Sequence, residues 1–320
     1  MRTSLAVLTF AIVLAASGTA SADPSCVLTA SPTLPKNTTL FTGAIGSDAI
    51  ATFTGQSLVI TATLGSGRAR VRTGGGFRLE GFVEAPLIPL FLSKNVALVE
   101  GAVWLGSGRP VTQVGTKNDL VEVELRAGAP IEQTLRAPAP CASLSLEPTS
   151  LKHPSPPGDA RAWRTKTVPL AIAREPGKDA VFRFTSPSAA GKLVFFGTER
   201  RDALVHVLLF GDVVVDGWAN ASDLEALPEG EIQDAPGAPR VTSSSASISL
   251  GGTPAKARPS REVAIMGRTS GGLEKIGVIE AGTEVLVLDT VAGWATVVPA
   301  SLALMPADAR PFLAKADDLK

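Results

Sequence analysis

The sequence contains no tyrosine and only two histidines, two cysteines and three methionines among its 320 residues. Histidine and cysteine are the side chains that most often bind zinc or supply the base and the nucleophile of an enzyme. No HExxH motif, no pair of CxxC motifs and no histidine cluster occurs in the sequence. We therefore expect a protein that is not an enzyme and that has neither a metal site nor a cofactor.

An excess of charge is absent too, because Lys plus Arg and Asp plus Glu each number 30. A chain without net charge exerts no long-range attraction on nucleic acid or anionic lipid. After residue 16 the sequence also lacks an apolar run near the ~20 residues that a membrane-spanning helix needs. We expect no nucleic-acid partner and no transmembrane segment in the mature chain. Hydrophobic residues, at 45%, nevertheless suffice for folded cores.

The N-terminus has the three parts of a secretory signal peptide. Met1-Arg2-Thr3 is positively charged, residues 5–16 form a short apolar run, and Ala20-Ser21-Ala22 matches an A-x-A cleavage site. The apolar run is too short to cross a bilayer comfortably. These features predict a signal peptide over residues 1–22 and an exported product, in the periplasm or outside the cell.

The two cysteines, Cys26 and Cys141, are predicted to form a disulfide, since exported proteins usually pair an even number of cysteines. Closing a loop of roughly 115 residues contributes about 4–5 kcal/mol in the chain-entropy model. The alternative is a lipid anchor on Cys26. However, Asp23-Pro24-Ser25 precedes this cysteine, whereas a lipidation site needs an aliphatic residue and small residues there.

An aromatic residue followed by small residues and a leucine recurs along the chain. The copies are GWANASDL at residues 217–224, GFVEAPL at 81–87, PFLAKADDL at 311–319 and, more weakly, LRAPAPCASL at 135–144. β-prone runs separated by glycine-rich turns precede the copies. Each copy is predicted to be a last strand that passes into a single helical turn, with the aromatic residue in a core and the leucine closing that core.

These endings divide the chain into four expected modules, at residues 28–88, 89–146, 167–228 and 261–320. Residues 147–166 and 229–260 contain many Pro, Gly, Ser and Ala residues, which predicts two linkers. The pentapeptide LGSGR occurs both at 64–68 and at 105–109 in matching strand–turn contexts. This recurrence favours an internal duplication of the first two modules.

The last module has the most informative order of residues. EVAIM at 262–266 and IGVI at 276–279 precede AGTEVLVLD at 281–289 and GWATVV at 293–298. This order resembles bacterial SH3-like (SH3b) domains, in which an aliphatic–Gly–Thr strand precedes a Gly-Trp strand and a terminal aromatic ending. The resemblance implies an all-β fold of tandem small SH3-like barrels joined by Pro/Gly/Ser-rich linkers. It also implies a binding or scaffolding role in the cell envelope.

Basic residues gather on two adjoining predicted strands. Arg68, Arg70 and Arg72 alternate along one strand, and Arg78 begins the next. One interpretation is an ordinary solvated strand face. The other is a binding surface for the carboxylates of an acidic polymer, because arginine forks bind such anions through two parallel hydrogen bonds.

Tryptophans are the other candidate binding residues. Trp104, Trp218 and Trp294 fall in predicted strands, where a role in the core is the alternative to a ligand platform. Trp163 falls in the expected linker 147–166, either as an exposed aromatic residue or as a plug between the second and third modules. The absence of tyrosine argues against recognition of proline-rich helices, which requires an aromatic-lined groove.

The remaining motifs favour structural roles. His153 is expected in a solvated loop, and His206 in a strand with a structural or surface role. Residues 188–193 (SAAGKL) fail as a phosphate-binding loop, because the first glycine is missing and Leu193 stands where a hydroxyl residue would hold magnesium. Asn37 and Asn220 begin glycosylation sequons.

Together these features predict an exported, non-catalytic protein that binds cell-wall peptide or an envelope protein. Several weak modules on one chain would raise the overall affinity through effective concentration. A structural spacer or adhesin-like protein without a specific ligand is the alternative. An envelope hydrolase is a third hypothesis, but it needs a nucleophile with a partner base, or a metal site.

Overall fold

The computed structural model describes residues 26–150, 156–228, 254–307 and 310–320. The predicted signal peptide and His153 lie outside these ranges. The described chain is built from β-strands in three antiparallel sheets and from short 3-10 turns, without an α-helix in these ranges. The predicted all-β class is therefore confirmed. No helix in the same ranges has the length and apolar character needed to span a membrane.

Sheet I is the largest and has the order β1-β4-β5-β6-β23-β22-β27-β25-β24-β21, with β2, β3 and β26 attached beside it. Its strands are β1 (Cys26–Ala30), β2 (Thr39–Phe41), β3 (Ala49–Phe53), β4 (Ile60–Leu64), β5 (Arg68–Thr73), β6 (Phe77–Glu84), β21 (Ala255–Ala257), β22 (Val263–Thr269), β23 (Gly272–Ile279), β24 (Val285–Val291), β25 (Trp294–Pro299), β26 (Leu304–Pro306) and β27 (Leu313–Lys315).

Sheet II has the order β12-β11-β10-β7-β13. Its strands are β7 (Leu90–Leu92), β10 (Pro110–Lys117), β11 (Leu120–Arg126), β12 (Thr134–Pro140) and β13 (Leu144–Ser145). Sheet III has the order β16-β15-β19-β18-β17-β14-β20, with β9 attached to β19 and β8 attached to β9. Its strands are β8 (Val96–Val99), β9 (Val103–Leu105), β14 (Arg161–Thr165), β15 (Leu170–Ala173), β16 (Ala180–Phe184), β17 (Val194–Arg201), β18 (Leu204–Leu209), β19 (Val213–Asn220) and β20 (Leu224–Ala226).

The strands follow the two-residue period of the sequence. In β5, Ala69 and Val71 are buried, whereas Arg70 and Arg72 are exposed on the opposite face. This alternation arises because successive side chains of a strand point to opposite sides of the sheet. The buried residues of all three sheets form one contiguous apolar cluster.

The predicted turns after the last strands are confirmed. The 3-10 turns η1 (Ala85–Leu87), η2 (Cys141–Ser143), η4 (Ala221–Asp223) and η5 (Ala316–Leu319) directly follow β6, β12, β19 and β27. The leucines Leu144, Leu224 and Leu319 are buried, as the pattern predicts.

The first copy of this ending departs from the prediction. Leu87 is 39% exposed and does not close a core. Phe82 is only half-buried, because Gly81 and Val83 take the buried positions of β6 and alternation turns Phe82 to the outer face. The expectation that the aromatic residue of every copy lies in a core is therefore wrong for Phe82.

The sheets run across the expected module boundaries. Residues 77–79 of β6 pair with residues 277–279 of β23, and β26 pairs with β3, so the first and last modules share sheet I. In the same way, residues 103–105 of β9 pair with residues 213–215 of β19 in sheet III. Within the described ranges, none of the three sheets closes on itself as a barrel. Phe82 and Trp294, expected in separate units, consequently lie in one sheet.

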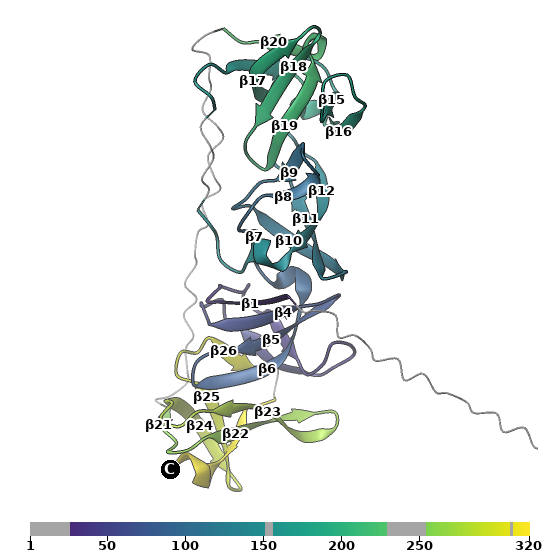
Figure 1. The fold of residues 1–320 in the computed structure, drawn as a ribbon. Helices are drawn as coiled ribbons and strands as arrows, with labels where there is room; N and C mark the ends of the chain where they lie inside the picture. The colour runs from purple at the N-terminus through teal and green to yellow at the C-terminus, as the bar shows by residue number, and fades with distance from the viewer. Residues whose placement is uncertain (1–25, 151–155, 229–253, 308–309) are drawn as a thin grey trace, which may run out of the picture.

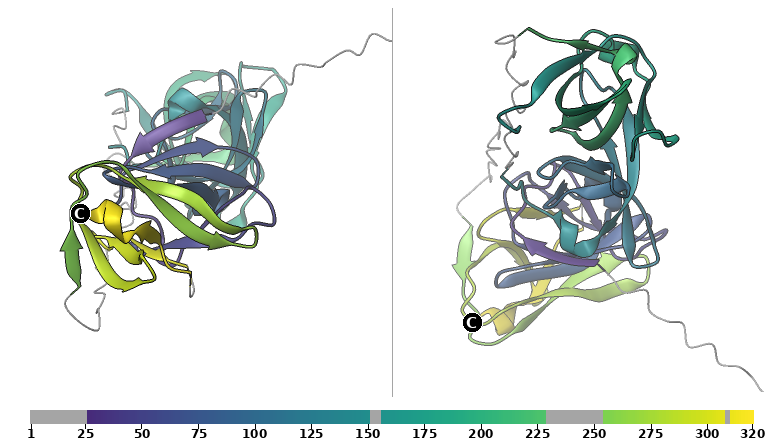
Figure 2. Two further views of the ribbon diagram at one scale, coloured as in Figure 1. Left: turned by 90° about the horizontal axis from the view of Figure 1, so that it is seen from below. Right: turned by 45° about the horizontal axis from the view of Figure 1, so that its top comes forward.

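The three sheets stack into an elongated column (Figure 1). Sheet III lies at one end, sheet II in the middle, and sheet I at the other end, where the strands of residues 254–320 lie against those of residues 26–88 (Figure 2). Sheets I and II are joined by a hydrogen bond of 2.6 Å from Gln113 Nε2 to the Gly65 carbonyl oxygen. The order of modules along the column therefore differs from their order in the chain.

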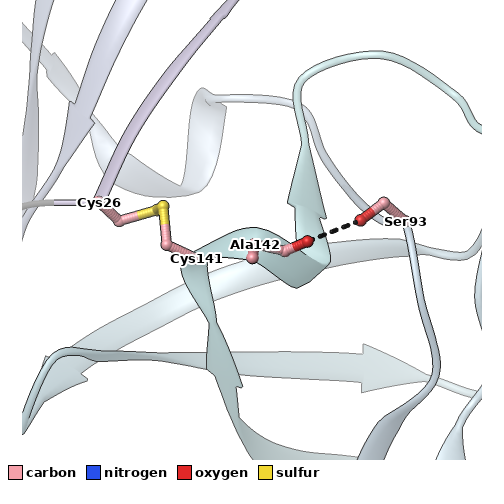
Figure 3. The surroundings of a disulfide bond; sticks show 4 residues. All are labelled: Cys26, Ser93, Cys141 and Ala142. Atoms are coloured by element: carbon pink, nitrogen blue, oxygen red, sulfur yellow. Dashed lines mark hydrogen bonds between the residues drawn. A yellow bond between two sulfur atoms is a disulfide. The ribbon is translucent and has the colours of Figure 1, made fainter.

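The predicted disulfide is present between Cys26, at the start of β1, and Cys141, in η2 (Figure 3). Beside it, the hydroxyl of Ser93 donates a hydrogen bond to the carbonyl oxygen of Ala142. The disulfide thus links β1, the edge strand of sheet I, covalently to sheet II.

Candidate functional site

A gap in the strand pairing of β6 marks the candidate site. On one side, residues 80–84 of β6 pair without a break with β5. On its other side, residues 77–79 pair with β23, and Phe82 pairs with Phe41 of β2. Glu80 and Gly81, between these two pairings, have a strand partner only on the β5 side within the described chain. Strands β2 and β23 separate at this point and leave a groove, which we call the β6 groove.

The β6 groove has a volume of about 540 Å³. This is within the range of roughly 300–1,000 Å³ that is typical of ligand sites. Its lining comprises Thr42, Ile50, Arg70, Arg72, Arg78, Leu79, Glu80, Gly81, Phe82, Glu274, Lys275, Ile276, Gly277 and Val278. A second cavity of about 340 Å³ shares Arg72 and Arg78 with it. The groove is therefore formed jointly by residues near the two ends of the described chain.

The lining of the β6 groove is net positive although the whole chain is neutral. It contains four cationic and two anionic side chains. Arg70 forms an ion pair with Glu80, and Arg78 forms one with Glu280 at 2.8 Å between Nη2 and Oε1. These pairs neutralise part of the lining and fix the direction of two guanidinium groups.

Two groups in the groove are left without partners. Glu80 lies opposite Arg72 in the strand register but pairs with Arg70 instead, so Arg72 has no carboxylate partner in the described part of the chain. The Nε–H of Arg78 is buried and has no hydrogen-bond partner among the described residues. An unsatisfied buried donor costs about 1–3 kcal/mol. Arg72, which is exposed, could donate hydrogen bonds to an anionic group.

The sequence-predicted arginines separate into two kinds. Arg68 is structural: its guanidinium lies 3.7 Å over the ring of Phe41, pairs with Glu84 at 2.8 Å and donates a hydrogen bond to the Gly43 carbonyl oxygen. Arg70 and Arg72, in contrast, line the β6 groove. Of the basic cluster, Arg68 therefore has a structural role, and the other arginines form part of the wall of the groove.

The sequence-predicted tryptophans do not join the groove. Trp163 lies in β14, a strand of sheet III, so this part of the expected linker 147–166 belongs to a sheet. Its indole packs so closely against Gly197 that a Cβ there would lie 2.3 Å from Nε1. Trp218 in β19 is 7% exposed and is covered by Arg201. Trp294, in β25, is half-buried in sheet I. The structure thus brings together Arg70 and Arg72 but none of these tryptophans.

His206 lies at the centre of a second polar cluster, in sheet III. Its Nδ1 lies 2.7 Å from Thr198 Oγ1, and its Nε2 lies 2.7 Å from Asp216 Oδ1. The three residues lie on neighbouring strands of sheet III, and the imidazole packs against Trp218 with 5.1 Å between ring centroids. The arrangement contains a hydroxyl, an imidazole and a carboxylate, but it lies outside both cavities of sheet I. It holds three strands together on the outer face.

Sequence reasoning missed the C-terminal wall of the groove. Glu274, Lys275 and Gly277 lie about 200 residues beyond the arginines in the chain, and no local pattern connects them to β6. Nothing in the local sequence distinguishes Glu274 and Lys275 from other charged residues of the chain. Only the pairing of β6 with β23 reveals their role.

Metal binding finds no support in the geometry: in the ranges that the structure describes, no group of three or more His, Cys, Asp or Glu side chains is placed to hold an ion. Comparisons of the chain with protein-family models, with curated proteins and with solved structures find no match.

Proposed function

We propose that the protein is an exported, non-catalytic binding and scaffold protein of the bacterial cell envelope. It binds cell-wall peptide or an envelope protein weakly, at more than one place along the column. The observation that carries this proposal is the β6 groove, a ligand-sized, net-positive cavity in which Arg72 has no carboxylate partner among the described residues. The disulfide supports export, because such bonds persist in oxidising compartments.

The proposal includes an SH3-like origin for the modules. Its support is the repeated sequence of a long strand, a 3-10 turn and a short strand, seen at η1, η2 and η4. In this interpretation, the ancestral small barrels have opened and merged their edges with those of a neighbouring module. Merging protects strand edges that would otherwise be free to aggregate.

The direct test is a pull-down of the purified mature chain with isolated cell wall. Wild-type protein is expected to sediment with the wall. Arg72→Ala is expected to weaken this, whereas Arg126→Ala, which removes an 85% exposed arginine from sheet II, should not. Trp294→Ala and Trp218→Ala test the tryptophans as platforms, with circular dichroism to show that each variant folds. Failure of the wild-type protein to bind wall would contradict the proposal.

A structural spacer is the second candidate function. The observation in its favour is the continuity of the column, in which shared sheets, one apolar cluster and a disulfide join all modules. Small-angle scattering would show a rigid rod of constant length in either case. A spacer without a ligand would not sediment with the wall, and mutation of Arg72 would not change its sedimentation.

An envelope hydrolase is tested with the same wall preparation. Release of soluble muropeptides by wild-type protein, abolished in His206→Ala, would replace the binding proposal by a catalytic one. The absence of such release together with sedimentation is the expected outcome.

A further inference from the structure

We propose that the β6 groove takes a short, extended peptide that carries carboxylates, and that this peptide contacts the first and last modules at once. The inference rests on the proposed binding function and adds the class of ligand and the consequence of its binding. Three features of the groove support it: the gap in strand pairing, the guanidinium of Arg72, which has no carboxylate partner among the described residues, and the joint origin of the walls.

The pairing gap favours a peptide over other anions. Glu80 and Gly81 have a strand partner on one side only. On the other side, the pairing of β6 with β23 ends at residue 79, and the pairing with β2 is at residue 82. Gly81 is buried beside the Phe41 carbonyl, whereas Glu80 is exposed, so an extended peptide can add main-chain hydrogen bonds at Glu80. Because the gap is two residues long, only a short stretch of the peptide can pair there.

The charges favour carboxylates on that peptide. Arg72 is exposed and has no carboxylate partner in the described chain, and it lines both cavities. The neighbouring Arg78 carries the orphaned Nε–H. Hydrogen bonds between a guanidinium and a carboxylate are about twice as strong as neutral ones, and the planar fork directs them. A peptide carboxylate at Arg72 would supply the partner that this guanidinium lacks in the described chain.

The two walls of the groove come from different modules, so ligand binding is coupled to the docking of these modules. Arg70, Arg72 and Arg78 belong to residues 26–88, whereas Lys275 and Val278 belong to residues 254–320. A ligand that needs both walls binds only when the two modules are docked. By mass action it must therefore stabilise their docking.

The probe for the test is fluorescently labelled hexa-L-glutamate, added to the full mature chain at low salt and followed by anisotropy. Hexa-L-lysine and hexa-L-glutamine serve as charge controls. An alginate oligomer of similar charge serves as a carboxylate without peptide groups. We expect saturable binding of hexaglutamate alone and a rise in the apparent melting temperature with it.

The variants separate the roles of charge and geometry. Arg72→Ala is expected to weaken hexaglutamate binding by about ten-fold, the loss of one charged hydrogen bond. Arg72→Lys keeps the charge but loses the fork, so an intermediate affinity is expected. Arg126→Ala should bind like wild type. The exposed position of Arg72 means that these variants are expected to fold, which circular dichroism checks.

Each outcome decides the inference. Equal binding of alginate and hexaglutamate would show that charge alone acts and would overturn the peptide claim. Unchanged binding in Arg72→Ala, binding of hexalysine, or no binding of hexaglutamate would overturn the site.

Sedimentation with cell wall separates this inference from the proposed function. If hexaglutamate does not bind through Arg72 while wild type and Arg72→Ala sediment equally with wall, the protein binds wall elsewhere and only the inference fails. If hexaglutamate binds through Arg72 but wall does not bind, the groove stands and the envelope function fails.

Discussion

Asp48, in the first module, and Arg310, near the C-terminus, form an ion pair with 2.6 Å between Oδ1 and Nη1 across a separation of 262 residues. The other carboxylate oxygen, Oδ2, accepts a hydrogen bond of 2.6 Å from the backbone N–H of Ser270. One aspartate thus contacts both the β22–β23 turn and the segment before β27. These contacts add to the strand pairings that hold the two ends of the described chain together.

The first prediction concerns acid. The backbone N–H of Ser270, followed by the Arg310 guanidinium, lowers the pKa of Asp48 from 3.8 to about 2. A lowered pKa in the folded state means that the stabilisation is fully present above about pH 4 and is lost as pH falls toward 2. Unfolding by denaturant at a series of pH values should show this loss in wild type and a smaller pH dependence in Asp48→Asn. The same pH dependence of the free energy of unfolding in both proteins would show that the contact does not contribute to stability.

The second prediction concerns the close approach of β23 to β6. A Cβ on Gly277 would lie 2.1 Å from the carbonyl oxygen of Arg78, which is backbone and cannot move aside. Gly277→Ala should therefore destabilise the junction of the first and last modules by about 1–3 kcal/mol. Gly282→Ala is a poor control because its φ is +77°. Gly158→Ala, with open space at Cβ, is the matched control and should unfold at the wild-type midpoint.

The third prediction concerns the disulfide. Cys26 and Cys141 close a loop with a sequence separation of 115. Their replacement by serine in a double variant should lower the free energy of unfolding by about 2–5 kcal/mol. Denaturant titrations of wild type with and without a reducing agent should reproduce the difference. A variant as stable as the oxidised wild type would show that the linkage between sheets I and II is redundant.

The fourth prediction concerns an aromatic contact between the two ends of the described chain. Phe312 is fully buried and packs on Phe77 with 5.7 Å between ring centroids. Phe312→Ala should cost about 3–5 kcal/mol, because it leaves a cavity at the junction of the modules. Phe210→Ala, at a half-buried site beside Phe196, should cost clearly less. Thermal unfolding by circular dichroism compares the two, and equal losses would contradict a core role for Phe312.

The local structure of this protein follows from its sequence. Alternation of apolar and charged residues predicts strands such as β5, the glycine-rich runs predict the turns, and small residues before a leucine predict the 3-10 turns at η2, η4 and η5. The cysteine count and the expected export predict the disulfide. All of these depend on neighbouring residues or on composition, which a sequence displays directly.

The partners of each strand were decided only by the tertiary structure. Nothing local to β6 indicates that β23, about 200 residues away, pairs with it, or that β9 pairs with β19. A strand edge presents the same N–H and C=O groups to any partner, so pairing across the chain leaves no local pattern. The β6 groove exists because two such partners separate at Glu80 and Gly81, and the sequence could therefore supply Arg70 and Arg72 but not the opposite wall.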